Sequence, residues 1–366
     1  MKESIQQMID WIEDKLQGEF SLDGLASHMG YSPYYCSFKF HQVTGLSIRR
    51  YMLLRRLYLS TGDLGMNRKI MTVAVDYNYS SQEAYSRAFK EVFGISPSDF
   101  QRHQMPVQSI ARLMTYSEEG ANYINIRRET EVAHLQSEKS QLFDQDVLNI
   151  LNGQVMYEEF KSKKLMGNSD YAPFNEAMCV HETTLPIFDS TFIQTRALGH
   201  EDSIESYSDK VIQPLTKLNQ KNYNYIVLWF GEDLFCQMNL LTVLAYLEQS
   251  NYRGTVYLNS FREDEFKVIQ TELTLGNYQS VYEEVLVNHK KPTHVLLPVM
   301  YQAIKLYLEM LTENNPVTNY IARNKQLSQS ELLKQLFEVF PMIGYGDTQY
   351  IELINKVRLM NSNDHV

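Results

Sequence analysis

The residues best suited to chemistry in this sequence are polar side chains spaced to lie on one face of a helix. In the stretch SSQEAYSRAFKEVFGISPSDF, residues 80–100, helical periodicity places the apolar residues on the opposite face. The polar face comprises Gln82, Glu83, Ser86, Arg87 and Lys90. Side chains of these types can hydrogen-bond to base edges, so the pattern suits a helix lying in the major groove of DNA.

A second copy of this pattern lies upstream. Ser32 to Gly45 (SPYYCSFKFHQVTG) matches Ser81 to Gly94 (SQEAYSRAFKEVFG) at a constant offset of 49 residues. In each copy a serine can cap the start of the helix and a glycine can end it. The repeat therefore predicts two helices of the same kind, each with defined ends.

Each predicted helix follows a shorter one across a tight turn. Ser21 to Met29 precedes the turn Gly30-Tyr31, and a helix that includes Ile70, Val73 and Ala74 precedes the turn Asn78-Tyr79. Helix, turn and helix in this order are typical of helix-turn-helix units, whose second helix enters the groove. A long helix over Ser47 to Leu59 joins the two units and can hold them about one DNA turn apart, roughly 34 Å.

With these features the first hundred residues resemble the DNA-binding domain of the AraC/XylS family of bacterial transcription regulators. The resemblance covers residues 5–104, and its strongest signature is the run SQEAYSRAFKEVFGISP. It implies that Gln82, Glu83, Ser86 and Arg87 face bases and that Lys90 lies nearer phosphate. The residues that it implies for the first helix are Tyr34, Tyr35, Ser37 and Phe38, with His41 and Gln42 nearer the DNA backbone.

Two positions depart from the family pattern. Asn78 stands where the second turn usually has glycine, and asparagine tolerates the left-handed backbone, so we expect the turn to form. Phe38 stands where a polar residue is common. A phenylalanine can only contact thymine methyl groups or stack, so we expect the first helix to read sequence weakly or through DNA shape.

Charge and composition limit the other possibilities. The chain has 366 residues and a net charge of −10, but the first 105 residues carry 12 Lys and Arg against 11 Asp and Glu. This part, which we call the head, is thus nearly neutral, and the rest carries the acidic excess; the balance permits DNA binding without requiring it. The three cysteines are widely spaced, and the histidines show no metal-binding spacing. We expect free thiols in the cytoplasm, no cofactor, no metal and no membrane segment.

The sequence patterns in the rest of the chain predict both helices and strands, and they contain no catalytic signature. We expect a linker over residues 106–120, one or two strands in NYINIRRETEVAHLQSE, and a helix over Asp144 to Phe160. Strand-like residues follow between Thr184 and Arg196. Helices are expected over Val295 to Leu311 and Ser330 to Phe340, and a last one after Asp347.

The clearest sequence pattern in this region is that of a βαβ unit. Ile226 to Phe230 predicts a buried strand, Gln237 to Leu247 a helix and Thr255 to Leu258 a second, parallel strand. Ligands of open α/β sheets bind at the carboxyl ends of strands. The candidate ligand-binding residues there are Trp229, Glu232, Asp233 and Cys236. Alternatively, Trp229 belongs to the core and an acidic residue caps the helix.

The sequence thus predicts a multidomain chain: an all-α domain with two helix-turn-helix units and an α/β (α+β) effector region. The expected domains are residues 1–105, which bind DNA, 106–120, a linker, 121–220, an α+β segment, and 221–366, a ligand-sensing domain. From Tyr225 onward the chain also resembles an uncharacterised bacterial domain, through WFGED and the closing pattern GxGDxQ. That resemblance implies no activity.

The function expected is sequence-specific regulation of transcription by binding double-stranded DNA. The family resemblance favours an activator, and nothing in the residues excludes a repressor. We expect the acidic C-terminal part, which is not an enzyme, to sense a small molecule or a partner and to change DNA affinity or contact with RNA polymerase. Two alternatives stay open: an enzyme with a DNA-targeting module, its chemistry at Glu232, Asp233 and Cys236, or a body that only binds proteins. The oligomeric state also stays open, since two reading units in one chain make dimerisation unnecessary.

Overall fold

The computed structural model describes residues 2–113, 131–132, 135–136, 139–261 and 268–363. The chain divides into two compact units. The first contains Met1–Gly120, Thr312–Pro341 and Tyr345–Val366, and the second, which we call the sheet unit, contains Ala121–Leu311 and Met342–Gly344. No helix in the described ranges combines the length and the apolar character needed to cross a membrane.

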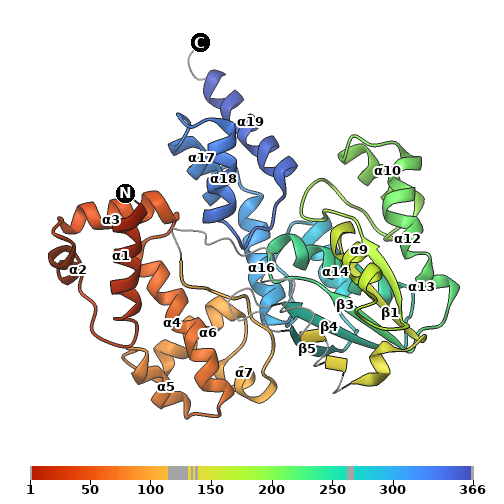
Figure 1. Cartoon of the computed structure of the whole chain (residues 1–366), viewed down its shortest axis with the longest axis horizontal. Helices are drawn as coiled ribbons and strands as arrows, with labels where there is room; N and C mark the ends of the chain where they lie inside the picture. Colours follow the sequence, from red (N-terminus) through yellow and green to blue (C-terminus); the bar gives the residue numbers. More distant parts are fainter. Residues whose placement is uncertain (1, 114–130, 133–134, 137–138, 262–267, 364–366) are drawn as a thin grey trace. The chain divides into compact units, whose positions relative to one another are not determined.

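The head is helical throughout its described length. Its helices are α1 (Lys2–Glu13), α2 (Leu22–Met29), α3 (Pro33–Thr44), α4 (Ile48–Gly65), α5 (Ile70–Asp76), α6 (Gln82–Phe93) and α7 (Pro97–His103). Figure 1 shows α4 running between the group α1–α3 and the group α5–α7. Each group has its own apolar core, one around Phe40 and Met8 and the other around Phe89 and Leu57.

The helix ends in the head form where the sequence predicts them. The side chains of Ser32 and Ser81 accept hydrogen bonds from the first turns of α3 and α6. Gly45 and Gly94, with φ of 72° and 78°, end the same helices in the left-handed conformation. The turn residue Asn78 also has a positive φ, 64°, which confirms that asparagine supports this turn without glycine.

The connecting helix α4 is anchored to α1 by a buried ion pair. The Arg55 guanidinium bonds to both carboxylate oxygens of Glu13, at 2.9 and 2.8 Å, and the Tyr51 hydroxyl donates to the same carboxylate at 2.5 Å. Burial of the hydroxyl and its hydrogen bond to the Glu13 carboxylate raise the pKa of Tyr51 above its usual range. The contact therefore fixes α4 relative to the first group of helices.

The first unit also contains three helices from the end of the chain. They are α17 (Pro316–Arg323), α18 (Gln329–Val339) and α19 (Asp347–Asn363). Ser328 and Glu331 form a reciprocal capping box at the start of α18, and α18 and α19 follow the sequence prediction closely.

The sheet unit is built on one five-stranded sheet in the order β2-β1-β3-β4-β5. The strands are β1 (Val147–Asn152), β2 (Asp170–Phe174), β3 (Tyr225–Trp229), β4 (Thr255–Phe261) and β5 (Val268–Leu273), and only β5 is antiparallel to its neighbour. The chain moves from β1 outward to β2 and then back across to β3. The strand order thus reverses between β1 and β3.

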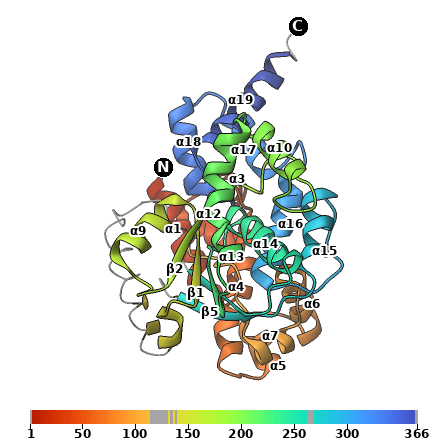
Figure 2. The ribbon, with the colours of Figure 1, turned by 90° about the vertical axis from the view of Figure 1, so that its right-hand side faces the viewer.

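Helices cover both faces of this sheet. Figure 2 shows α9 and α14 on opposite sides of the strands, as right-handed crossovers in opposite directions require. The helical segments whose bounds the structure describes in the sheet unit are η1 (Ser140–Phe143), α9 (Gln154–Lys163), α10 (Ser190–Gly199), α11 (Ile204–Tyr207), η2 (Ser208–Ile212), α12 (Gln213–Leu215), α13 (Lys217–Gln220), α14 (Leu234–Gln249), α15 (Tyr278–Tyr282), η3 (Glu283–Val287) and α16 (Pro298–Met310).

The βαβ unit β3–α14–β4 is confirmed, and two other predictions are wrong. Asp144 to Phe160 is not one helix, because β1 and the start of α9 share this stretch. The run Val147–Leu151 pairs with β3 and is fully buried, so sheet pairing outweighs its helical periodicity. The stretch from Thr184 to Arg196 forms no strand; Asp189 caps α10 by accepting a hydrogen bond from the Phe192 amide at 2.7 Å. The strands expected in residues 122–138 fall mostly outside the described residues.

Candidate nucleic-acid interface

Helix α6 presents its polar face to solvent. Tyr85, Phe89 and Phe93 are fully buried on its inner face and hold the helix in the head. Glu83, Arg87 and Lys90 are exposed on the outer face, with Gln82 and Ser86 partly exposed beside them. The five side chains named from the sequence therefore lie together, and their use as DNA contacts stays a prediction.

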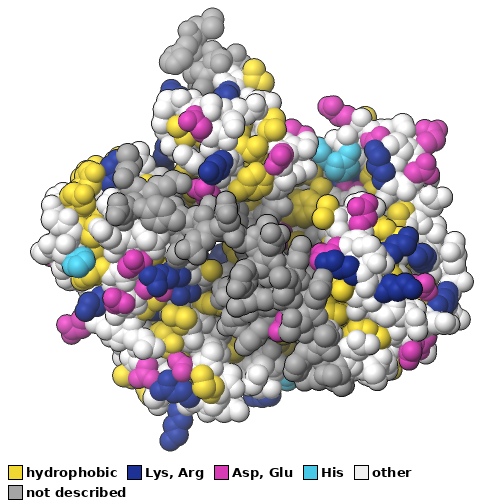
Figure 3. Space-filling view, in the orientation of Figure 1, with side chains coloured by type: hydrophobic (Ala, Val, Ile, Leu, Met, Phe, Trp, Pro, Cys, Tyr) yellow, Lys and Arg dark blue, Asp and Glu magenta, His cyan; other side chains and the backbone are white. Residues whose placement is uncertain are grey.

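Charge is distributed along α6 in a way that suits two kinds of contact. Hydrogen bonds at the helix start, from its backbone and from Ser81, lower the pKa of Glu83. Glu83 is thus an anion that can accept from a base amino group, and Arg87, one turn on, can donate to guanine. Basic and acidic side chains are interspersed on the face of the head drawn in Figure 3. This face of the head is therefore not a basic patch, and specific contacts with DNA would have to come from individual side chains.

The outer face of α3 differs from that of α6. Tyr34, Tyr35 and Phe38 are exposed, and Ser37 is partly exposed. The face is predominantly aromatic, so it offers few hydrogen-bonding groups to base edges. The structure brings the four predicted residues together on one surface but leaves only Ser37 and the tyrosine hydroxyls as polar contacts.

The last two residues predicted for α3 interact within the first unit. The Arg323 guanidinium donates to Nε2 of His41 at 2.8 Å. Gln42 is exposed, and its side-chain oxygen accepts a hydrogen bond from the Lys39 ammonium at 2.9 Å. Contact of either side chain with the DNA backbone would compete with these interactions.

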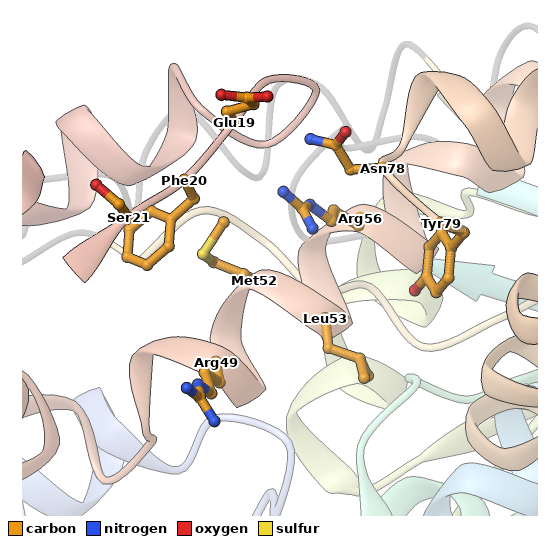
Figure 4. Close-up of a pocket in the computed structure, with 9 residues that line it drawn as sticks. All are labelled: Glu19, Phe20, Ser21, Arg49, Met52, Leu53, Arg56, Asn78 and Tyr79. Atoms are coloured by element: carbon orange, nitrogen blue, oxygen red, sulfur yellow. The ribbon is translucent and has the colours of Figure 1, made fainter.

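A pocket of about 690 Å³ lies beside α4 in the head. Figure 4 shows Met52 and Arg56 of α4 on the side of the segment that carries Glu19, with Asn78 near Arg56 and Arg49 farther along α4. Arg56 donates to the carbonyl oxygen of Leu16 at 2.7 Å, so it supports the loop between α1 and α2. Its lining combines basic, acidic, polar and apolar side chains, which does not define a particular ligand.

The candidate ligand residues of the sheet unit do not share one role. Trp229 is fully buried against Phe160 on the α9 face, and its indole N–H donates to Asn149 Oδ1 at 2.8 Å. Asp233 caps α14 by accepting from the Cys236 amide at 2.8 Å. Glu232 is buried. The alternatives of a core tryptophan and an acidic cap thus describe the observed contacts.

The start of α14 is closed by a distant segment of the same unit. The amides of Leu234 and Phe235 donate to the carbonyl oxygens of Met342 and Ile343, at 2.8 and 3.1 Å. Gly344, with φ of 71°, packs against Asp233, and a Cβ there would meet Asp233 Oδ1 at 2.1 Å. These amides are therefore engaged within the protein and do not form an open anion site.

Three polar residues at this sheet edge were not singled out from the sequence. Asn152 donates to Cys236 Sγ at 2.9 Å, and Asn239 donates to Asn152 Oδ1 at 2.9 Å. Gln237 is fully buried and donates to the carbonyl oxygen of Gly231 at 2.7 Å. Its Oε1 has no hydrogen-bond partner within the described part of the chain. Asn152 ends a strand that the sequence predicted as helix, and Gln237 and Asn239 lie within the predicted helix α14, so no sequence signal marked this group.

Burial also determines the chemistry of Cys236. Burial and the neighbouring Asp233 raise the pKa of its thiol well above the usual value. A neutral thiol is a poor nucleophile, so the geometry does not favour covalent chemistry here. Among the residues that the structure describes, no group of three or more His, Cys, Asp and Glu could hold a metal ion.

Comparisons with known proteins match the head. Residues 25–103 match a family model described as a helix-turn-helix domain. Over 102 residues the chain is 32% identical to the Transposon Tn10 TetD protein of Escherichia coli and 35% identical to the Regulatory protein SoxS of Salmonella typhimurium. Each match covers 28% of this chain, and 74% and 94% of the respective relative. Over 95 residues it is 32% identical to the HTH-type transcriptional activator AarP of Providencia stuartii, covering 26% of this chain and 70% of that protein.

The helical head with its exposed polar helix therefore defines a helix-turn-helix DNA-binding protein. The match to the 35% identical regulator SoxS covers 94% of that protein, so the family within this class of proteins can also be stated. The chain belongs to the AraC-type family of transcription regulators. The family model ends at residue 103, so the sheet unit lies outside it.

Proposed function

We propose that this protein is a sequence-specific regulator of transcription in the cytoplasm that binds double-stranded DNA through two helix-turn-helix units. The units are α2–α3 and α5–α6, with α3 and α6 in successive major grooves. The observation that carries the proposal is the matched register of α3 and α6, with a serine cap and a left-handed glycine at equivalent ends. The anchored helix α4 supports it, because a rigid connection fixes the distance between the reading helices.

Within the second unit, we assign base contacts to Gln82, Glu83, Ser86 and Arg87, and a phosphate contact to Lys90. Their exposure on one face of α6 supports this assignment. We further propose that the protein is an activator that contacts RNA polymerase. Support comes from the relative AarP, which is described as a transcriptional activator.

Substitution of Arg87 tests the DNA-reading role. Arg87→Ala should weaken binding to the selected operator by about 1–3 kcal/mol and relax sequence preference at one position. Arg102→Ala is the matched control, because Arg102 is also exposed in the head but lies on α7 beside Asp99. Both are measured by titration of labelled duplex at fixed salt. Equal affinities of Arg87→Ala and wild type for operator and scrambled DNA would refute the base contact.

For the sheet unit we propose sensing of a small molecule or a partner at the carboxyl edge between β1 and β3. The reversal of strand order there supports a binding site, because the loops after such strands diverge. The buried Oε1 of Gln237, which has no hydrogen-bond partner among the described residues, supports a ligand that donates a hydrogen bond. Such a ligand would have to displace the segment Met342–Gly344 from the start of α14.

A thermal-shift screen of small molecules on the full chain tests this site. A true ligand should raise the melting temperature of wild type and lose its effect in Gln237→Leu, which removes the acceptor. Gln329→Leu, on the exposed start of α18, is the matched control and should keep the response. A ligand whose effect is equal in all three proteins binds elsewhere.

A further inference from the structure

The outer faces of α3 and α6 have different chemistry at equivalent positions. With the constant offset of 49 residues, Tyr34 corresponds to Glu83 and Phe38 corresponds to Arg87. The α6 residues are charged, whereas the α3 residues are aromatic. Tyr34 is 79% exposed and Phe38 is 49% exposed. Two large rings thus occupy the positions from which the partner helix presents its charges.

These rings form one continuous surface. Tyr34 and Phe38 are one helical turn apart, with ring centroids 6.3 Å from each other and ring planes inclined by only 8°. Tyr31 and Tyr35, with centroids 4.8 Å apart, extend the surface. The Lys39 ammonium lies 5.7 Å from the centroid of the Phe38 ring and places a positive charge beside it. The surface is therefore apolar at its centre and basic at one side.

The chemistry of the major groove limits what such a surface can recognise. A phenyl ring has no hydrogen-bond donor or acceptor, and the 5-methyl group of thymine is the apolar group that the base pairs present there. Exposed apolar side chains that line an interaction face gain free energy only when an apolar partner covers them. The surface is the outer face of α3, one of the two helices proposed to enter the major groove, so the methyl groups of the duplex are the partner that fits its chemistry.

We propose that Phe38 and Tyr34 recognise thymine 5-methyl groups in one half of the operator, whereas α6 reads the other half through hydrogen bonds and charge. This inference rests on the proposed function, since it requires that α3 lies in the major groove. The two helices would then recognise different features of the base pairs: α3 contacts methyl groups, and α6 contacts hydrogen-bond donors and acceptors.

Replacement of thymine by deoxyuridine tests the inference, because it keeps base pairing and removes only the methyl group. A duplex that binds the full-length protein is first selected from a random pool, and each thymine is then replaced singly. We expect each contacted methyl to contribute about three- to fivefold in affinity, the scale of burying one methyl group. The sensitive positions should cluster in one half of the site.

Variants connect the effect to the two rings. Phe38→Ala and Tyr34→Ala should bind the thymine and uracil duplexes with more nearly equal affinity, and Phe38→Leu should retain part of the preference. Arg87→Ala is the matched control: it should weaken binding to the other half and keep the preference for thymine. Because Phe38 and Tyr34 are exposed, circular dichroism should show the variants folded.

Two results would overturn the proposal, and they differ from failure of the proposed function. Wild-type binding that is insensitive to uracil at every position excludes methyl recognition and leaves the aromatic surface to another partner. A thymine preference unchanged in both alanine variants excludes these rings as its source. Failure to select any duplex would instead refute the DNA-binding function on which the inference rests.

Discussion

At the scale of single residues, a buried group of charged side chains lies inside the sheet unit. Glu176, fully enclosed, accepts from Arg196 at 2.5 Å, contacts His200 Nε2 at 2.7 Å and accepts from the Tyr207 hydroxyl. Arg196 also donates to the carbonyl oxygens of Val180 and Ala177, at 2.7 and 3.0 Å. Two buried charges thus hold together the loop that follows β2. None of these residues is conspicuous in the sequence.

This group predicts an acid-sensitive sheet unit. Burial opposes ionisation of Glu176, but Arg196 and His200 outweigh it and lower its pKa to about 2. A depressed pKa stabilises the fold above the usual carboxyl range, and the contribution disappears as the pH falls from about 5 to about 2. We expect Glu176→Gln to lower the free energy of unfolding at pH 7 by on the order of 3 kcal/mol. On acidification, the free energy of unfolding of this variant should fall less than that of the background protein.

The measurement is urea unfolding across this pH range, followed by Trp229 fluorescence in a Trp11→Phe background. Trp229 is buried in the sheet unit and Trp11 lies in the head, so the signal reports the relevant unit. Glu205→Gln, at an exposed position, is the matched control and should behave as the background does. If the free energy of unfolding of Glu176→Gln and of the background protein changed with pH in parallel, the ion pair would not be the cause of the acid sensitivity.

At the scale of elements, the reading helices depend on their ends. Ser81 Oγ accepts from the Ala84 amide at 3.1 Å, and Gly94 ends α6 with φ of 78°. These local features are encoded by neighbouring residues, which is why the sequence predicts the bounds of α6 closely. The same argument applies to α3 between Ser32 and Gly45.

Loss of the cap should loosen α6 measurably. Ser81→Ala leaves the amides of the first turn without their acceptor and should cost about 1 kcal/mol. In hydrogen exchange, amides at the start of α6 should then exchange about fivefold faster. Ser27→Ala, at an exposed position inside α2, is the matched control and should leave exchange in α6 unchanged. Unchanged exchange in Ser81→Ala would show that packing alone holds the helix start.

At the scale of the whole molecule, the proposed function requires the head to hold α3 and α6 at a constant spacing. The buried pair Arg55–Glu13 and the separate cores on either side of α4 make the connection stiff. The acidic excess lies outside the head and offers no attraction to phosphate. If the protein binds DNA as proposed, we expect its specific affinity to come from simultaneous use of both half-sites.

An altered operator spacing tests this conclusion. Insertion of 5 base pairs between the half-sites adds roughly half of a 10–10.5 base-pair turn. The second major groove then faces the opposite side of the duplex. We expect affinity to fall to that of a single half-site, with no recovery at 10 inserted base pairs, because the rigid head cannot reach the next groove. Titration of the three duplexes at fixed salt measures this, and tolerance of both insertions would contradict a rigid head.

The sequence by itself determined the features that depend on neighbouring residues. The repeat, the caps at Ser81 and Gly94, the left-handed turn at Asn78 and the unit β3–α14–β4 follow from local patterns and were predicted from them. Only the tertiary structure decided the features that depend on distant residues. It showed that Val147–Leu151 pairs with β3 instead of joining a helix, that Glu176 meets Arg196 in the core, and that Met342–Gly344 closes the start of α14. Periodicity reports which face of an element is apolar, but the pairing partner of a strand and the counterion of a buried charge are set by long-range packing.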